Sequence, residues 1–315
     1  MWFLVNGKHK ILSAIEAMDN DLFKPRSEEQ KVELKNHLQN MINFCYTFVL
    51  MGAFTCTLFG VFPFTDSGEL KLPLAGWYPF QSQLFVVLYA YQLTQETSLA
   101  ICNISIDCIT VCFLDHMCNH IKILNNQLKH MKEICHDTLE KKKLSLGERI
   151  DNKRELQKLM DDLLVKCFDH YTYVLRMKRD VEEIFGMGIF VMFMFDCIAL
   201  CMTMFQLLII SFKSIQFISI IIYMICITTE LMAYCWFGNE LLVVSSQVAV
   251  AAYESDWTDT PVYFQKNLLM FITITMKPMK VKVVHLNLSV DTFTAIMRTA
   301  WSYFAVLRQK YNENT

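Results

Sequence analysis

The most informative ionisable residues lie near the carboxyl end of the chain, inside an otherwise apolar stretch. Asp291, Arg298, Ser302 and Gln309 are spaced 7, 4 and 7 residues apart. A helix turns by about 100° per residue, so residues 7, 11 and 18 positions apart return to nearly the same side. The four side chains therefore form one polar stripe. Ionisable groups inside a membrane nearly always face a bundle interior or a water-filled path. The stripe indicates either a helix that lines an aqueous pore or groups that pair with neighbours inside one subunit.

The other polar residues give no starting point for enzyme chemistry. His116 and His120 are four residues apart on one helical face, but no second pair of ligands has a comparable spacing, so a polar helix end is the preferred interpretation over a metal site. HExxH, GxSxG, Walker and GxGxxG motifs do not occur in the sequence. We therefore predict no catalytic residue, no metal and no cofactor.

Isolated acidic residues and abundant aromatic residues lie within the apolar stretches. The acidic ones are expected to meet a buried partner rather than a ligand: Glu96, Asp107, Asp196 and Glu230. Aromatic side chains in the outer or middle parts of the stretches are the kind that line a pocket for a small apolar molecule, with plain helix packing as the alternative for each. Our pocket candidates are Phe54, Phe59 and Tyr91.

Composition indicates the elements that must carry these residues. Of the 315 residues, 54% are hydrophobic, and only 9 are Gly and 6 are Pro, which is typical of a helical membrane protein. A bilayer span needs about 20 mainly apolar residues. Five stretches qualify: Met41–Phe64, Leu84–Leu114, Ile184–Phe212, Ser214–Phe237 and Val283–Leu307. The last is the weakest by hydropathy, because it contains His285 and the polar stripe. We predict an all-α, polytopic transmembrane helical bundle.

The distribution of Lys and Arg predicts the orientation. Segments 1–40, 117–183 and 239–282 hold 6, 14 and 4 of these residues, whereas 65–83, residue 213 and the tail after 307 hold 1, 1 and 2. Cytoplasmic loops carry the excess of positive charge, so the N-terminus is predicted inside and the C-terminus outside after five crossings. The net charge of −2 gives no reason to expect a nucleic-acid partner.

Four regions follow from this layout. They are a cytoplasmic segment 1–40, transmembrane helices one to four over 41–237 with a cytoplasmic helical extension 115–183, a cytoplasmic anchor segment 238–282, and a final helix with an extracellular tail over 283–315. In the extension, apolar residues recur at helical spacing, as at Ile121, Leu124, Leu128 and Met131.

A helix is expected in the anchor segment over Pro261–Lys277. Thr260 would cap it, Pro261 would occupy its first position, and Pro278 would stop it. Four of its apolar residues lie outside the lipid and must be buried against something, for which other subunits are the natural partner. They are Leu268, Leu269, Phe271 and Ile272.

The carboxyl-terminal motifs closely resemble the signature of insect odorant receptors. They are Leu268-Leu269-Met270, Lys277-Pro278, Asp291-Thr292-Phe293 and the run from Arg298 to Gln309. The resemblance implies an odorant-gated cation channel in the plasma membrane of olfactory sensory neurons. There a subunit that binds a small, volatile, apolar odorant assembles with the olfactory co-receptor into a hetero-tetramer, and the final helices surround the pore.

Particular residues take roles by the same resemblance. Val306 falls at a pore-constricting position of the family and Gln309 at a neighbouring pore-lining one. Lys310 stands where the co-receptor has a second hydrophobic gate residue, which indicates that this chain is not the co-receptor. The family places its N-terminus inside, as the charge count does. G-protein-coupled receptors have the reverse topology, and a transporter would usually show internal repeats, which do not occur here.

The family has seven spans, and five are present. Met1–Asn6 stands where the second span should end. We therefore expect the first two spans to be missing, as in a partial gene model, and part of the odorant pocket with them. An in-frame upstream exon encoding two apolar spans would support this expectation.

Overall fold

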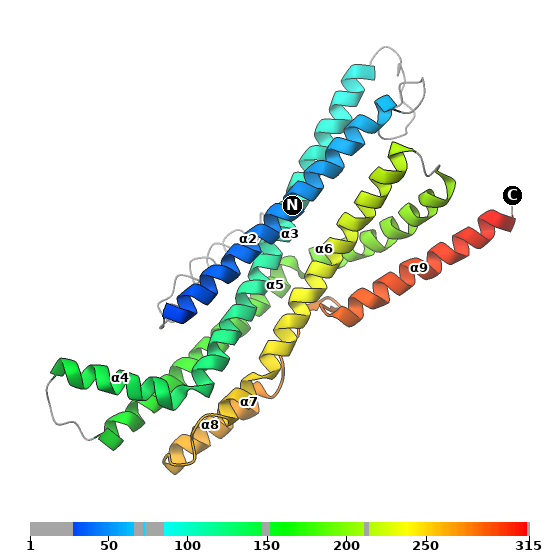
Figure 1. Ribbon diagram of the computed structural model, residues 1–315. Coiled ribbons are helices and arrows are strands. Elements are labelled where there is room, and N and C mark those ends of the chain that lie inside the picture. Colours follow the sequence, from blue (N-terminus) through cyan, green and yellow to red (C-terminus); the bar gives the residue numbers. More distant parts are fainter. Residues whose placement is uncertain (1–27, 66–71, 73–84, 147–151, 211–213, 314–315) are drawn as a thin grey trace. The chain divides into compact units, whose positions relative to one another are not determined.

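The computed structural model describes residues 28–65, 72, 85–146, 152–210 and 214–313 (Figure 1). Nearly all of them are helical, and the one sheet is a hairpin of two very short strands. The elements, in chain order, are α2 (Glu28–Thr65), α3 (Phe85–Lys129), α4 (Met131–Leu146), α5 (Asn152–Ile209), α6 (Ile215–Ser246), α7 (Val248–Tyr253), α8 (Val262–Thr275), β1 (Lys282–Val283), β2 (Leu286–Asn287) and α9 (Val290–Glu313). The predicted all-α class is confirmed.

Among the described residues, four helices contain stretches long and apolar enough to cross a membrane: Lys35–Val61, Phe85–Lys129, Lys153–Ile209 and Gln216–Tyr253. Each includes most of one of the first four spans predicted from sequence. Only 11% to 39% of each apolar stretch is buried inside the structure. A helix that exposes this much apolar surface needs lipid or another subunit around it.

The fifth predicted span begins later than expected. We placed it over Val283–Leu307, but α9 runs over Val290–Glu313, and residues 282–287 form the hairpin. The start at Val283 is therefore wrong, and His285 lies in the hairpin turn instead of the helix. Because α9 carries the polar stripe, it is not among the four helices that are apolar enough to be recognised as spans.

The chain divides into two compact units. Unit 1 comprises Met1–Gln30, Phe113–Gly188 and Trp236–Leu288, and unit 2 comprises Lys31–Cys112, Ile189–Cys235 and Ser289–Thr315. The helices α2, α3, α5 and α6 contribute residues to both, so each unit is described by itself below.

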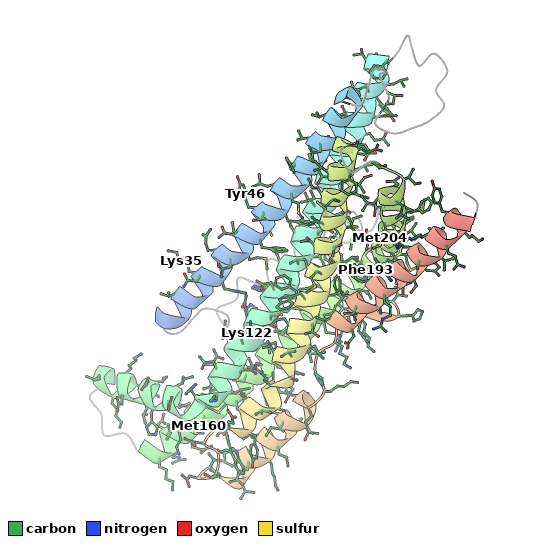
Figure 2. The ribbon with its side chains drawn as sticks, turned by 45° about the vertical axis from the view of Figure 1, so that its right-hand side comes forward. Lys35, Tyr46, Lys122, Met160, Phe193 and Met204 are labelled. Atoms are coloured by element: carbon green, nitrogen blue, oxygen red, sulfur yellow. The ribbon has the colours of Figure 1, made fainter. Side chains whose placement is uncertain are left out.

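The core of unit 1 includes a ridge along the carboxyl-terminal part of α3 and the first residue of α4. Its residues alternate in steps of three and four, which keeps them on one side of a helix, and all are fully buried: Leu114, Met117, Ile121, Leu124, Leu128 and Met131. The helical character predicted for the extension is confirmed here. Lys122, labelled in Figure 2, forms an ion pair of 2.9 Å with Glu240 of α6 at the edge of this core. Both side chains are partly exposed, so the pair contributes at most about 1 kcal/mol.

Two boundaries in unit 1 differ from those expected. The charged stretch 141–152 favours a solvated connection between two helices, but α4 continues to Leu146, and residues 147–151 lie outside the described ranges. Pro261 is the N-cap of α8 in an extended conformation and not its first helical residue. The hydroxyl of Thr260 does not cap the helix, because it donates to the carbonyl oxygen of Trp257.

Unit 2 has its own core of aromatic and aliphatic side chains. Phe193 of α5 (labelled in Figure 2) packs edge-on against Tyr234 of α6, with ring centroids 6.0 Å apart. Leu200 of α5 and Leu231 of α6 are also fully buried. From α9, Ala300 and Phe304 are the buried residues. This core fixes which face of α9 is covered and which is left open.

Candidate functional site

The final helix α9 has two distinct faces. Ala300 and Phe304 are buried, and the half-buried residues lie around them: Phe293, Ile296, Met297 and Leu307. The predicted stripe residues Asp291, Arg298, Ser302 and Gln309 are all exposed. At about 100° per residue, the centre of the stripe is about 180° from Ala300. The stripe therefore faces away from the rest of unit 2.

The side chains of the stripe have few partners within the chain. The Ser302 hydroxyl donates to the Arg298 carbonyl oxygen at 2.9 Å, a bond within the helix. Among the ion pairs of the described residues, none includes Asp291 or Arg298. Val306 lies on the flank of the stripe and is 57% exposed. Of the two interpretations that the sequence left open, pairing of Asp291 and Arg298 inside one subunit thus finds no support from these ion pairs.

A buried polar cluster joins α3 to α6 inside unit 2. The Tyr234 hydroxyl donates to Asp107 Oδ1 at 2.8 Å. The Asn103 amide donates to Asp107 Oδ2 and to Glu230 Oε1, at 3.2 Å each. Tyr234 is 1% exposed and Asp107 is 3% exposed. Buried charged and polar groups need such partners, because an unpaired one costs several kcal/mol of desolvation.

The expectation that Asp107 and Glu230 are isolated is therefore wrong, whereas the expectation that they meet buried partners is confirmed. The sequence does contain a signal for the cluster. Asn103 and Asp107 are four residues apart on one helix, and Glu230 and Tyr234 are four apart on another. Each pair shares a helical face, so the two spans carry matching polar faces. The amide of Asn103 is engaged by two carboxyl groups.

A small cavity of about 10 Å³ lies beside the polar cluster. Phe44 and Phe48 of α2 line it together with residues of α3 and α6, namely Asp107, Cys108, Val111, Glu230, Ala233 and Tyr234. A water molecule needs about 10 to 15 Å³ of such space. The cavity therefore has room for at most one water, and an odorant would enter only if the helices separated.

The predicted pocket residues lie elsewhere on unit 2. Phe54 and Tyr91 are more than half exposed, and Phe59 is half-buried. None of the three lines the cavity beside the cluster. Their part in odorant binding stays a prediction.

The histidine pair belongs to a longer chain of imidazoles in unit 1. His116 Nε2 lies 2.8 Å from His120 Nε2, and His120 Nδ1 lies 3.2 Å from His170 Nε2 on α5. Both ring nitrogens of His120 thus contact other imidazoles. Within the described residues, no group of three or more His, Cys, Asp or Glu side chains has the geometry to hold a metal ion. Sequence reasoning missed His170, because it lies 50 residues along the chain from His120.

The anchor helix α8 divides the four predicted subunit-contact residues between its two faces. Leu268 and Phe271 are buried within the chain, and Ile272 is half-buried. Phe271 packs against Phe168 and Tyr171 of α5, with ring centroids about 6 Å apart. Leu269, by contrast, is 63% exposed. Of the four, only Leu269 is fully available to another subunit.

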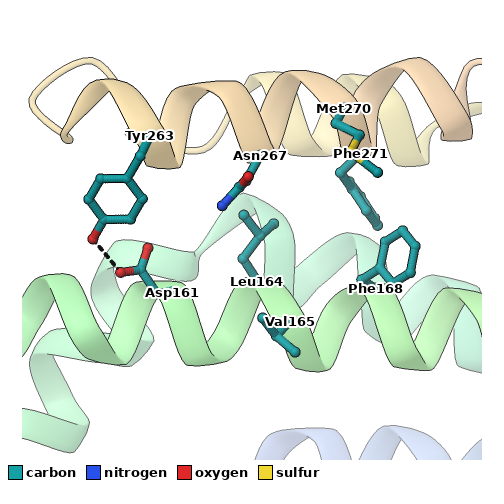
Figure 3. A pocket seen from close by; sticks show the side chains of 8 residues that line it. All are labelled: Asp161, Leu164, Val165, Phe168, Tyr263, Asn267, Met270 and Phe271. Atoms are coloured by element: carbon teal, nitrogen blue, oxygen red, sulfur yellow. Dashed lines mark hydrogen bonds between the residues drawn. The ribbon is translucent and has the colours of Figure 1, made fainter.

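A groove of about 380 Å³ runs between α5 and α8 (Figure 3). At one end, the Tyr263 hydroxyl donates to Asp161 Oδ2, and this hydrogen bond is the main cause that raises the pKa of Tyr263 above its ordinary value. The remaining lining is largely apolar: Leu164, Val165, Phe168, Asn267, Met270 and Phe271. The groove is open, so it continues the exposed apolar face of α8.

Comparison with known proteins matches both the sequence and the fold. A family model described as "7tm Odorant receptor" matches residues 1–301. Odorant receptor Or1 of Anopheles gambiae is 21% identical over 319 residues, covering 96% of this chain and 76% of that protein. Odorant receptor 85f of Drosophila melanogaster is 20% identical, covering 72% of this chain and 53% of the relative. The chain thus spans from about half to about three quarters of the length of these two relatives.

The solved structures agree with the sequence match. The insect olfactory receptor OR5 from Machilis hrabei in complex with eugenol superposes with a TM-score of 0.79 at 15% identity, covering 96% of this chain and 74% of that one. A second structure of the same receptor gives a TM-score of 0.80 at 15% identity. The family match over nearly the whole chain, the helical fold, the candidate spans and the carboxyl-terminal motifs all agree. This chain belongs to the insect odorant receptor family.

Proposed function

We propose that this chain is the odorant-binding subunit of a ligand-gated cation channel, which it forms with the olfactory co-receptor. As a member of the odorant receptor family it is a multi-pass membrane receptor and not an enzyme. The step from receptor to channel subunit is supported mainly by the two faces of α9.

The polar face of α9 is costly unless it meets water. Arg298 lies eight residues into the helix, which is roughly 12 Å from its start. An exposed charged residue at the centre of a span costs about 2.5 to 3.5 kcal/mol when it faces hydrocarbon. Several copies of α9 arranged around a water-filled axis would remove this cost, because each stripe would then face the aqueous path. The covered face with Ala300 and Phe304 would remain against its own unit.

Two residues near the end of α9 fit the narrow part of such a pore. A hydrophobic constriction blocks ions by making their dehydration costly, whereas a polar ring lowers that barrier. Val306 is exposed beside the stripe and suits the constriction, and Gln309 lies on the stripe itself and suits the polar ring. In a mixed tetramer the co-receptor supplies most of the pore wall, so this chain modifies the pore.

The proposal includes an orientation of the chain in the membrane. Four helices with apolar stretches and α9 together make five crossings, with the N-terminus inside and the C-terminus outside. The Lys/Arg-rich extension of α3, α4 and α5 and the anchor helix α8 then lie in the cytoplasm. A G-protein-coupled receptor would place these segments outside the cell, where their excess of positive charge is disfavoured.

Subunit contact is assigned to the outer face of α8. Leu269 and Met270 are both more than 60% exposed, although this segment has no lipid to cover it in the proposed topology. An exposed apolar face of this kind marks a protein contact. We infer that the co-receptor covers it in a hetero-tetramer.

We infer the ligand class from the aromatic and aliphatic residues that unit 2 carries, among them Phe54, Phe59 and Tyr91. Aromatic and aliphatic side chains select small apolar molecules by shape and by a few polar contacts. OR5 of Machilis hrabei was solved in complex with eugenol, a small volatile phenol. We propose a ligand of similar size and polarity for this chain, bound among the outer halves of its spans in the plasma membrane of olfactory sensory neurons.

Co-expression in a heterologous cell tests the proposal. Cells that make this chain together with the co-receptor are exposed to a panel of volatile phenols and terpenes that includes eugenol, and whole-cell current is recorded. We expect a cation current that needs both chains and persists when G proteins are blocked. Cells with the co-receptor alone provide the control. A response that disappears when G proteins are blocked would favour a G-protein-coupled receptor, and solute uptake without current would favour a transporter.

A further inference from the structure

The segment between α8 and α9 is a tightly packed joint within unit 1. It runs from Met279 to Leu288 and contains the antiparallel hairpin in which Lys282 pairs with Asn287 and Val283 with Leu286. Four of its side chains are almost completely buried: Met279, Val281, Val283 and Leu288. We call Met279–Leu288 the hairpin joint. Only Ser289 separates it from the first residue of α9.

Three backbone amides of the hairpin joint have defined acceptors. The Met279 amide donates to the buried hydroxyl of Ser245 on α6 at 2.8 Å. The Lys282 amide donates to the Glu182 carboxyl group on α5 at 2.6 Å. The Leu288 amide donates to the Val281 carbonyl oxygen at 2.9 Å. The joint is therefore tied to two other helices of unit 1 and closed on itself.

A glycine of α6 leaves almost no free space against the joint. A Cβ atom added to Gly238 of α6 would lie 2.4 Å from Leu288 Cβ and 2.6 Å from the Leu288 carbonyl oxygen. Real Cβ atoms do not approach other atoms so closely, and the backbone oxygen cannot rotate away as a flexible side chain would. Any other residue at position 238 must push Leu288 aside, and with it the point at which the chain enters α9. Gly188 of α5, in contrast, has nothing within 4 Å of an added Cβ.

The turn of the hairpin carries backbone strain. Val284 has a φ of 55°, and no other non-glycine residue in the described ranges has a positive φ. A two-residue hairpin turn with positive φ at its first central residue normally has Gly there, because a β-branched side chain collides with the backbone. The Val284 side chain is 44% exposed, so close packing does not account for the valine. Strain of this kind persists only where the surrounding structure enforces it.

We propose that the hairpin joint fixes the start of α9, with Gly238 as the residue that allows the joint to close and Val284 as a strained turn that keeps the joint easy to release. The two features act in opposite directions. The glycine contact stabilises the closed joint, and the strained turn destabilises it. Their balance would set how often the joint opens.

Amide hydrogen exchange on the purified complex with the co-receptor tests the joint itself, without reference to current. In Gly238→Ala the amides of Met279, Lys282 and Leu288 should exchange about tenfold faster than in the parent, because the joint opens more often. In Val284→Gly the same amides should exchange about tenfold slower, because glycine adopts this φ without strain. Gly188→Ala is the matched control and should leave them unchanged. Unaltered exchange in Val284→Gly overturns the proposal, even when Gly238→Ala fails to fold.

The coupling of the joint to α9 rests on the proposed channel function and has a separate readout. Resting current of the two variants should shift in opposite directions from the parent, with Gly188→Ala unchanged. Shifts of the resting current in the same direction, or no shift in either variant, would show that the joint takes no part in gating. A parent complex that conducts no current at all would instead refute the channel function, and the exchange measurements would still decide whether the joint exists.

Discussion

Removal of a single oxygen atom from the buried polar cluster should loosen the contact of α3 with α6. In Tyr234→Phe the hydroxyl that donates to Asp107 at 2.8 Å is lost, whereas the ring that packs on Phe193 is kept. Asp107 retains the weaker bond from Asn103 at 3.2 Å. In water-exposed proteins an unsatisfied buried acceptor costs about 1 to 3 kcal/mol. Hydrogen bonds between membrane helices contribute less, about 0.6 kcal/mol on average and up to about 1.7. We therefore expect a loss of about 1 kcal/mol.

The matched control is Tyr223→Phe on the same helix, because no hydrogen bond of the Tyr223 hydroxyl is found within the described residues. Thermal unfolding of the purified complex should show Tyr234→Phe melting roughly 2 to 4 °C below the parent and Tyr223→Phe unchanged. A double-mutant cycle with Asp107→Asn isolates the pair and should give a coupling of about 1 kcal/mol. Equal melting of the two phenylalanine variants, or strict additivity in the cycle, would refute the cluster as a link between the helices.

Two further predictions concern the interfaces of the proposed channel. Leu269→Asp should reduce recovery of the complex with the co-receptor in a pull-down by about tenfold, because it puts a charge into an apolar contact. Asn267→Asp adds the same charge about 200° around the helix from Leu269 and should have a small effect. Equal losses in the two variants would show that the interface is not at Leu269. Val306→Ser should raise resting current and Gln309→Ala should change cation permeability ratios moderately without abolishing the odorant response. Identical leak, permeability and blocker sensitivity in both would show that α9 does not line the pore.

Sequence periodicity predicts a single helix better than it predicts how helices meet. The polar stripe of α9 depends only on the geometry of one helix, and its four side chains share an exposed face in the structure. Leu268 and Leu269 are chemically identical neighbours, and only the seating of α8 on α5 decides that one is buried and the other exposed. Sequence alone could not separate them.

The hairpin joint escaped prediction for a different reason. Its strands have two residues each, too few for an alternating pattern to show. In the sequence, Val283 and Val284 resemble the apolar start of a span. The last helix was therefore predicted to start at Val283, seven residues before its actual start at Val290. To predict the polar cluster, one would have to know which helices pair. Its spacing of four on each helix was visible, but its partners were not.

Accessibility of engineered cysteines along α9 tests the central claim, that the polar face of this helix lines an aqueous path, most directly. Ser302→Cys lies on the exposed stripe, and Ala300→Cys lies on the buried face of the same helix. A cationic, membrane-impermeant methanethiosulfonate reagent is applied to the conducting complex with the co-receptor, and the parent chain with its own twelve cysteines gives the background. We predict rapid modification and a changed current for Ser302→Cys, and neither effect for Ala300→Cys. Modification of Ala300→Cys at the same rate, or an unchanged current in Ser302→Cys when the reagent has reacted, would contradict the account.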